Sequence, residues 1–186
     1  MAKDDMQELY DRVLFSHQDI VDATKEVARK IENDYAGKNP LVIGALKGAV
    51  FFMTDLLKEA SLLCEIDFID VSSYGNSTTS SGKIRIDKDV QRDLTGRDIL
   101  IVEDIVDTGY TLKFMKDLFL ERGAKSVKCA VLLDKEARRA TDIKADYIGR
   151  ACPDEFVVGY GLDFAGKYRN VDFIGVPKDK YIKELG

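Results

Sequence analysis

The sequence has little of the residue types on which several common kinds of site depend. Its only histidine is His17, so a histidine-based metal or nucleophile site is excluded. The three cysteines, Cys64, Cys129 and Cys152, are far apart and form no C-x-x-C pair. A disulfide framework or a thiolate metal site is therefore not expected, and we interpret the cysteines as small buried residues in a reducing compartment.

Long apolar runs and a surplus of positive charge are also missing. No apolar run approaches the ~18 residues that a membrane span needs, and the N-terminal residues lack the apolar core of a signal peptide. The formal net charge is −5 at pH 7, whereas nucleic-acid-binding proteins usually present a basic face. We therefore expect a cytoplasmic protein with no nucleic-acid partner and no membrane partner.

No internal repeat, low-complexity tract or linker interrupts the 186 residues. Hydrophobic residues make up 45% of the chain, and this length is enough to bury a sizeable core. We expect a single domain over residues 1–186. Its core should run from about 16 to 140, with a small hood from about 141–186 together with N-terminal residues.

Strand-like and helix-like segments alternate along the expected core. Apolar runs predict strands, and helical spacing of apolar residues predicts helices. The predicted strands are 41–46, 63–72, 83–86, 99–102 and 126–133, and the predicted helices are about 16–37, 48–59 and 110–122. This alternation is typical of βαβ units and predicts a doubly wound, mainly parallel α/β sheet.

Two local patterns add detail to these elements. Ser16 and Asp19 form an approximate capping box at the start of the first helix. Residues 74–82 contain Gly, Asn, Ser and Thr but no large apolar side chain, a composition that predicts a flexible loop.

The most informative stretch runs from Ile99 to Thr111 and reads ILIVEDIVDTGYT. An apolar strand leads to two adjacent carboxylates, Glu103 and Asp104, and a small-residue turn then opens a helix. In open α/β sheets, ligands bind at the carboxyl ends of strands. The turn gathers backbone N–H groups, hydroxyls and a helix N-terminus, which suit a phosphate. The paired acids suit sugar hydroxyls or a bound Mg²⁺.

This order of residue types resembles the phosphoribosyl pyrophosphate signature of type I phosphoribosyltransferases. Other segments narrow the resemblance to the hypoxanthine-guanine phosphoribosyltransferase family. Leu46-Lys47-Gly48 resembles the family's pyrophosphate loop, in which a strained peptide bond precedes the lysine. Ser73-Tyr74 resembles the start of the lid that closes over the active site. FVVGYGLD at 156–163 resembles the base-binding strand, and Tyr168-Arg169 follows at the family's spacing.

The resemblance implies a role for each matching residue. Asp107 would be the general base that takes the proton from N7 of the purine. Glu103 and Asp104 would bind the ribose hydroxyls directly or through Mg²⁺, and Asp163 would hold a second Mg²⁺ through water. The implied phosphoribosyl pyrophosphate site consists of Lys47, Gly48, Ser73, Tyr74, Glu103, Asp104, Asp107, Thr108, Gly109, Tyr110, Thr111 and Arg169.

The resemblance also implies a site for the base. Lys135 would donate to O6 of the purine, Phe156 would stack on the ring, and the Val157 main chain would read the base edge, with Asp163 beside them. The implied reaction belongs to purine salvage. It transfers the 5-phosphoribosyl group to N9 of hypoxanthine or guanine and gives IMP or GMP plus pyrophosphate. The resemblance further implies Mg²⁺ as cofactor and a homodimer or homotetramer.

Two other interpretations stay open. One is a xanthine-preferring or pyrimidine phosphoribosyltransferase, although the combination of Lys135 with Phe156 and Val157 favours 6-oxopurines. The other is a non-catalytic regulator that senses nucleotides on the same fold. The presence of Lys47, Asp107 and Lys135 and the negative net charge argue against a regulator.

Overall fold

The structure is a computed structural model that describes residues 8–73, 84–180 and 182 of the chain. The flexible loop predicted at 74–82, with Tyr74 in it, lies outside the described residues. The elements in chain order are β1 (Tyr10–Phe15), α2 (His17–Tyr35), β2 (Leu41–Leu46), α3 (Val50–Glu59), β3 (Glu65–Ser73), β4 (Ile84–Lys88), β5 (Asp98–Val106), α4 (Tyr110–Glu121), β6 (Ser126–Asp134), the 3-10 helix η1 (Glu136–Arg138), β7 (Tyr147–Ala151) and β8 (Ile174–Pro177).

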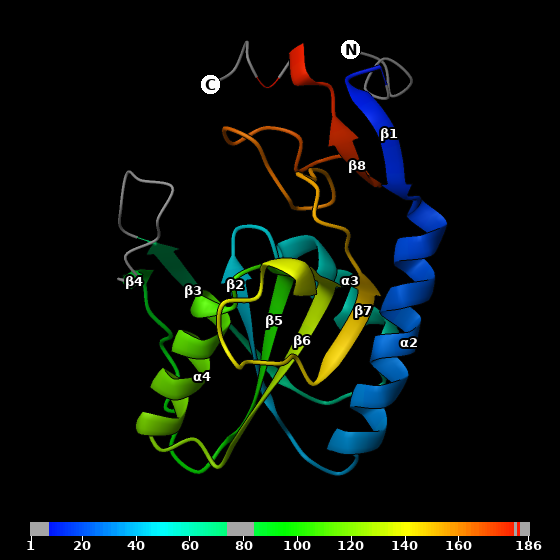
Figure 1. The fold of residues 1–186 in the computed structure, drawn as a ribbon. Helices are drawn as coiled ribbons and strands as arrows, with labels where there is room; N and C mark the ends of the chain where they lie inside the picture. The colour runs from blue at the N-terminus through cyan, green and yellow to red at the C-terminus, as the bar shows by residue number, and fades with distance from the viewer. Residues whose placement is uncertain (1–7, 74–83, 181, 183–186) are drawn as a thin grey trace.

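A six-stranded sheet with the order β4-β3-β2-β5-β6-β7 forms the centre of the molecule (Figure 1). Strand β4 is antiparallel to β3, and every other neighbouring pair in this sheet is parallel. The path β2-α3-β3 steps toward one edge, whereas β5-α4-β6 steps toward the other. The predicted doubly wound, mainly parallel sheet is thereby confirmed.

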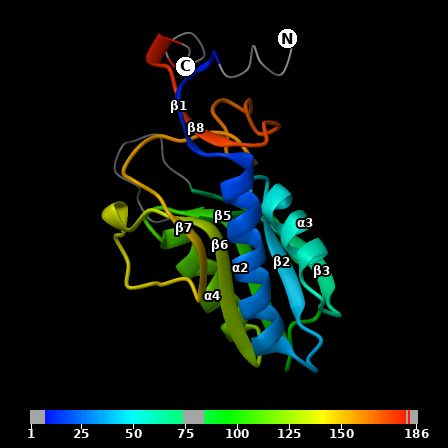
Figure 2. The same ribbon diagram turned by 90° about the vertical axis from the view of Figure 1, so that its right-hand side faces the viewer.

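The central strands bury both of their faces. Val42, Leu100 and Val102 belong to the core beneath α2 and α3. Ile99 and Ile101 point the other way and join the core beneath α4. Successive side chains of a strand alternate between faces, so an uninterrupted apolar run is what a strand covered on both sides requires. Helices α2 and α3 cover one face and α4 covers the other (Figures 1 and 2).

Helix α2 begins with the predicted capping box. Ser16 Oγ accepts a hydrogen bond from the Asp19 amide at 3.2 Å, and Asp19 Oδ2 accepts one from the Ser16 amide at 2.9 Å. The reciprocal bonds satisfy amides that the helix itself leaves unpaired. Although α2 has 19 residues, no helix in the described part of the chain is both long and apolar enough to cross a membrane.

A second, two-stranded antiparallel sheet of β1 and β8 lies beyond the carboxyl ends of the central strands (Figure 1). Its own small core includes Tyr10, Val158 and Phe173, and the rings of Tyr10 and Phe173 meet edge-on at 4.8 Å. This small sheet, which we call the hood, joins N-terminal and C-terminal residues.

The boundary of the hood differs from the one expected near residue 140. Strand β7 lies in the segment assigned to the hood, but it pairs in parallel with β6 as the sixth strand of the main sheet. Only Tyr147 and Gly149 of β7 are buried, because an edge strand is covered on fewer sides. Buried and exposed residues alternate along β7, so it lacks the uninterrupted apolar run from which the inner strands were predicted.

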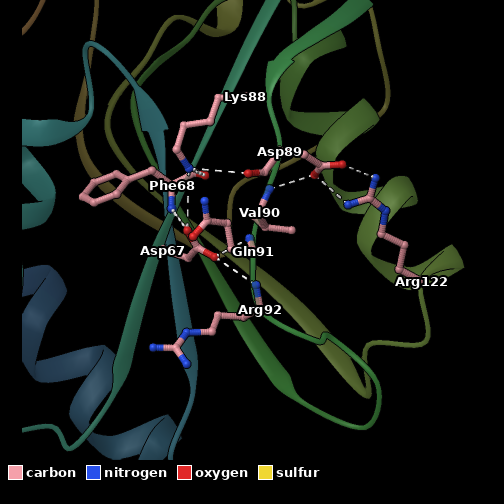
Figure 3. Close-up of polar contacts among 8 residues, drawn as sticks. All are labelled: Asp67, Phe68, Lys88, Asp89, Val90, Gln91, Arg92 and Arg122. Carbon is pink, nitrogen blue, oxygen red and sulfur yellow. Dashed lines mark hydrogen bonds and ion pairs between the residues drawn. The ribbon is translucent and has the colours of Figure 1, made fainter.

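A polar cluster joins β3 to the segment that follows β4 (Figure 3). Asp67 Oδ2 accepts hydrogen bonds from the amides of Gln91 at 2.7 Å and Arg92 at 3.2 Å. Asp89 pairs with the guanidinium of Arg122 at the end of α4 through two bonds of 2.7 Å. These contacts fix the connection from β4 to β5 against the flanking elements.

Candidate active site

The chain reverses its direction across the sheet between β2 and β5, which are neighbours. After β2 it continues into α3 on one face, and after β5 it continues into α4 on the other face. Loops that diverge at such a switch point leave a crevice at the carboxyl ends of the strands. The two loops here, 47–49 and 107–109, both contain residues that the sequence predicted for the site.

Glu103 and Asp104 lie inside β5, which runs to Val106 and is longer than the predicted strand. Burial raises the pKa of Glu103 well above its usual value, and the adjacent Asp104 carboxylate raises it further. Burial also raises the pKa of Asp104, although the Ile105 amide and Arg169 partly oppose that effect. Because both carboxylates are costly to ionise in this position, the pair favours a ligand that brings positive charge or hydroxyl donors.

A hollow of about 130 Å³ lies between the end of β5 and the start of α4. Helix α4 has Gly109 as its N-cap, at a left-handed φ of 87°, and no side chain caps it. Its first amides therefore remain available to a ligand, and the helix dipole favours an anion there. The predicted residues that line this hollow are Glu103, Asp104, Asp107, Thr108, Gly109 and Thr111. The predicted Tyr110 instead has a side chain 37% exposed on the first turn of α4.

Arg139, which the sequence did not single out, holds the 107–109 turn in place. Its Nε donates to the carbonyl of Asp107 at 3.1 Å, and its guanidinium pairs with the Asp134 carboxylate at the end of β6. A Cβ on Gly109 would lie 2.3 Å from Thr141 Oγ1, so the chain just after Arg139 packs directly on the turn. Arg139 thus supports the backbone that forms the phosphate-sized hollow.

A second cleft of about 530 Å³ adjoins the first, and Asp104 and Asp107 line both. The volume lies in the range of sites for small organic ligands. Four residues predicted for the base line this cleft: Lys135, Phe156, Val157 and Asp163. The structure therefore places these four residues and six of those predicted for phosphoribosyl pyrophosphate around two adjoining hollows.

Lys135 is a buried lysine, 5% exposed, directly after β6. Its amide donates to the Val106 carbonyl at 2.9 Å, which ties it to β5. Its Nζ donates to the Glu155 carbonyl at 2.8 Å. An ammonium has three donors, so Nζ keeps donors for an acceptor in the cleft. A lysine on a loop is usually exposed, so the burial of Lys135 sets it apart from an ordinary surface lysine.

Asp107 stands between the two hollows with one oxygen unsatisfied. Its Oδ1 is buried and has no hydrogen-bond partner among the described residues. Its Oδ2 lies 3.6 Å from Nη1 of Arg138, whose Nε binds Asp154 Oδ1 at 2.8 Å. A buried carboxylate oxygen without a donor is costly, and a ligand N–H would satisfy it. Arg138 was not foreseen, because nothing local in the sequence relates it to Asp107.

The far wall of the cleft comes from the segment 156–169. The Phe156 ring is 47% exposed and meets Phe164 edge-on at 5.7 Å, so its face is free to stack. Asp163 Oδ1 pairs with Arg169 Nη2 at 2.6 Å, and Arg169 Nη1 donates to the Gly161 carbonyl at 2.5 Å. Asp163 and Arg169 are thus positioned by each other.

The loop after β2 lies beside Asp104, which lines both hollows, although no residue of the loop lines either one. The peptide bond between Leu46 and Lys47 is cis, as the resemblance implied, and the Lys47 side chain is exposed. A Cβ on Gly48 would lie 1.6 Å from Asp104 Oδ2, so this loop touches the end of β5. Ser73 is the last residue of β3 and pairs with Ile84. Tyr74, its predicted partner, lies outside the described residues.

The carboxylates of the crevice fit a magnesium ion that a substrate helps to bind. Within residues 8–73, 84–180 and 182, no three metal-binding side chains are clustered. Glu103, Asp104 and Asp163 nevertheless provide oxygen ligands, and the raised pKa values of Glu103 and Asp104 show that their charge is poorly compensated. Mg²⁺ usually binds through one or two carboxylates together with substrate phosphates and water. The donors present match this pattern.

Comparison with known sequences agrees with this geometry. The phosphoribosyl transferase domain family matches residues 13–165. The chain is 51% identical over 178 residues to the hypoxanthine-guanine phosphoribosyltransferase of Bacillus subtilis, covering 96% of this chain and 97% of that protein. It is also 51% identical over 173 residues to the bifunctional protein TilS/HprT of Listeria monocytogenes, covering 93% of this chain. The chain spans only 27% of that longer relative.

Solved structures give the same result. A hypoxanthine phosphoribosyltransferase from Staphylococcus aureus superposes with a TM-score of 0.91 at 43% identity, covering 95% of this chain and 96% of that one. The hypoxanthine phosphoribosyl transferase of Trypanosoma cruzi superposes with a TM-score of 0.90 at 38% identity, covering 95% and 96%. The family match, the extent of these similarities and the crevice at the switch point agree, and the chain belongs to the phosphoribosyltransferase family, in its hypoxanthine-guanine branch.

Proposed function

We propose that the chain transfers the 5-phosphoribosyl group of phosphoribosyl pyrophosphate to N9 of hypoxanthine or guanine, forming IMP or GMP and pyrophosphate in purine salvage. One observation carries the proposal: two adjoining hollows share Asp104 and Asp107. The smaller has the open N-terminus of α4, which suits a phosphate, and the larger has Lys135 and Phe156, which suit a 6-oxopurine. Two relatives named hypoxanthine-guanine phosphoribosyltransferase, each about half identical to this chain over most of its length, support the proposal.

Asp107 is the general base of the proposed reaction. N9 of the purine attacks C1′ of the ribose, the bond from C1′ to the pyrophosphate oxygen breaks, and the proton on N7 passes to Asp107. Asp107 lies between the two hollows, so it would stand next to both a base bound in the larger hollow and a ribose bound in the smaller one. The buried Oδ1, which lacks a partner among the described residues, is the oxygen suited to accept this N–H.

Lys135 and the 156–163 segment select the base. Lys135 Nζ donates to O6, and the Glu155 carbonyl that it also binds holds it in place. Phe156 stacks on the purine with its exposed ring, and the main chain of Val157 meets the base edge. An adenine presents an amino group at position 6, which cannot accept from an ammonium, so this arrangement disfavours it.

The phosphoribosyl pyrophosphate is bound by the residues around the smaller hollow. Thr108, Gly109 and Thr111 with the first amides of α4 hold the 5′-phosphate, and Lys47 and Arg169 face the pyrophosphate. Ser73, the last residue of β3, extends the proposed site, and Tyr74, which lies outside the described residues, is proposed as its partner. Glu103 and Asp104 hold the ribose hydroxyls, and these two carboxylates together with Asp163 would hold Mg²⁺. Bound there, Mg²⁺ would neutralise charge on the departing pyrophosphate.

We also propose a cytoplasmic location and assembly into a homodimer or homotetramer. The free thiols of Cys64, Cys129 and Cys152 suit a reducing compartment. Exposed apolar side chains near α3 and β3, Phe51, Leu63 and Ile66, offer surface that an assembly would cover. Light scattering on the purified chain measures the assembly, and a monomer at micromolar concentration would contradict it.

The test of function is an absorbance assay with Mg²⁺ and phosphoribosyl pyrophosphate that offers hypoxanthine, guanine, xanthine, adenine and uracil separately. We expect nucleotide from hypoxanthine or guanine and none from uracil. Turnover of xanthine above both would favour the xanthine-preferring alternative. Turnover of none of the five would contradict the proposed reaction and favour a nucleotide-sensing regulator.

A further inference from the structure

The turn at 159–162 has an unusual backbone. Gly159, Tyr160 and Gly161 have φ values of 111°, 46° and 98°, so three successive residues lie in the left-handed region. Glycine adopts that region freely, but tyrosine does so at a cost, and such a residue persists only where its surroundings hold it. Both the backbone and the side chain of Tyr160 are hydrogen-bonded. Its amide donates to the Val171 carbonyl at 3.0 Å, and its hydroxyl has a partner as well.

The side chain of Tyr160 is bound to α3. It is 5% exposed, and its hydroxyl donates to Asp55 Oδ2 at 2.6 Å. The ring also lies 6.1 Å from the ring of Phe51, on the first turn of the same helix. Burial and the bond to Asp55 raise the pKa of Tyr160, so the phenol remains a donor at neutral pH. This contact joins residues 105 positions apart in the chain.

The segments that carry Asp55 and Tyr160 both lead directly to the candidate active site. Helix α3 starts just after the 47–49 loop, and the Ala49 amide donates to Ala45 at the end of β2. On the other side, Gly161 lies on the loop itself, since a Cβ there would stand 2.1 Å from the Gly48 carbonyl oxygen. The next residues, Leu162 and Asp163, line the larger cleft.

We propose that Tyr160 and Asp55 are a positioning pair that holds the Lys47–Gly48 loop against the 159–163 turn. Neither side chain touches substrate in this scheme; they act through Gly48 and Gly161. Without the bond, α3 and the turn are free to separate, and the Gly48 peptide loses its fixed place beside Asp104. This inference rests on the proposed function in assigning the loop to pyrophosphate, whereas the coupling itself is a property of the fold.

The kinetic test compares Tyr160→Phe and Asp55→Asn with wild type. Tyr160→Phe removes the donor, and Asp55→Asn replaces the charged acceptor by a neutral amide, which weakens the bond; both variants keep the shape of the side chain. We expect the KM for phosphoribosyl pyrophosphate to rise about 5- to 20-fold, less than the full worth of a hydrogen bond to a charged group, because the pair acts on the site only through the loop. The kcat should stay within about twofold, and the KM for hypoxanthine should rise less than that for phosphoribosyl pyrophosphate, because Lys135 and Phe156 lie outside the 159–163 turn although Asp163 lies within it. The double variant should be no worse than either single one.

The chain offers a matched control in Tyr147→Phe. The Tyr147 hydroxyl also donates to an aspartate at 2.6 Å, namely Asp34 on α2, and Tyr147 is 4% exposed. This pair joins β7 to α2, and neither residue lines either hollow of the crevice. A general loss of stability would affect both tyrosine variants alike. An equal rise in KM with Tyr147→Phe, or additive effects of Tyr160→Phe and Asp55→Asn, would overturn the proposal.

Hydrogen exchange tests the pair without any catalytic activity. The amides of Ala49 and Val50 are hydrogen-bonded to Ala45 and Lys47, so their exchange reports on the loop. We expect their protection to fall about tenfold in Tyr160→Phe and Asp55→Asn and to stay unchanged in Tyr147→Phe. Unchanged protection in all three would refute the coupling. A loss of protection in a chain that forms no nucleotide would support the coupling and contradict only the proposed function.

Discussion

The Cα of Gly48 lies directly against the carboxylate of Asp104: a Cβ there would stand 1.6 Å from Oδ2 and 2.5 Å from Cγ. The contact joins the loop after β2 to the end of β5, the two strands at the switch point of the sheet. Only a residue without a side chain allows this approach. The position of the proposed metal-binding carboxylate therefore depends on the loop, and the loop depends on that carboxylate.

Replacing Gly48 by alanine is expected to displace the Asp104 carboxylate. A shift of about 1 Å in a catalytic group can cost about 10²-fold, so we expect kcat/KM for phosphoribosyl pyrophosphate to fall by that order. Initial rates at varied phosphoribosyl pyrophosphate and Mg²⁺ measure the effect. Gly37→Ala is the control: Gly37 has a φ of 72° and no atom within 4 Å of an added Cβ. It should lose about 1–2 kcal/mol of stability but no activity. Normal kinetics in Gly48→Ala would show that the contact is unimportant.

Replacing Asp107 by asparagine tests the general base. The substitution keeps the shape of the side chain and removes the proton acceptor, so we expect turnover to fall by about 10²–10⁴-fold. Binding of phosphoribosyl pyrophosphate, measured by calorimetry, should survive. The matched control is Asp117→Asn, which removes an exposed carboxylate of α4 that pairs with Lys113 at 3.3 Å. Near-normal turnover in Asp107→Asn would remove Asp107 from the base role.

The parts of the molecule that follow local patterns could be predicted from the sequence. The capping box of Ser16 and Asp19, the apolar run before Glu103 and the helix after Gly109 all depend on residues within a few positions of one another. The doubly wound sheet follows from the alternation of such elements. Of the residues proposed for the site, Lys47, Asp107 and Lys135 lie where loops leave β2, β5 and β6, which that alternation also places at one edge.

The parts that depend on distant partners could not be predicted. Arg139 binds the carbonyl of Asp107 across 32 positions, and Tyr160 binds Asp55 across 105. Neither pair has a local signature, because the partner is brought in only by the fold. Strand β7 was missed for a related reason: at the edge of the sheet it buries only Tyr147 and Gly149, too few for an apolar run.

Replacing Lys135 by methionine should affect the base and not the phosphoribosyl donor. Methionine fills a similar volume but removes the charged donor, whose hydrogen bonds are each worth about 1.5–3 kcal/mol. We expect the KM for hypoxanthine to rise by about 10- to 100-fold, with the KM for phosphoribosyl pyrophosphate nearly unchanged. Steady-state kinetics with each substrate varied in turn provides the measurement.

The control for Lys135 lies on the same strand. Lys128, near the start of β6, binds Asp34 Oδ2 at 2.5 Å and Tyr147 Oη at 3.3 Å, at the end of the strand remote from the crevice. Lys128→Met should lower stability and leave both KM values as they are. If Lys135→Met raises the two KM values equally, the lysine does not select the base.

The half-buried carboxylate of Asp67 predicts how stability depends on pH (Figure 3). Burial alone would raise its pKa, but hydrogen bonds from the amides of Phe68, Gln91 and Arg92 outweigh burial and hold the pKa below its usual value. In the unfolded chain the pKa is about 3.9. The folded chain therefore binds fewer protons near pH 4, and its stability rises with pH there. The contribution is fully present above about pH 5 and is lost as the pH falls through the folded pKa.

Urea denaturation of wild type and Asp67→Asn from pH 7 to pH 3 tests this sign. At pH 7 the variant should be about 1–3 kcal/mol less stable, because an amide cannot accept with both of its terminal atoms. The difference should shrink below about pH 4, because the carboxylate of the unfolded chain binds a proton there, and it should disappear once the pH falls through the lower pKa of the folded chain. Asp142→Asn, at a side chain 90% exposed, should show little difference at any pH. A gap for Asp67→Asn that stays constant down to pH 3 would mean that the three amides do not favour the ionised carboxylate, and that acid unfolding depends on other groups.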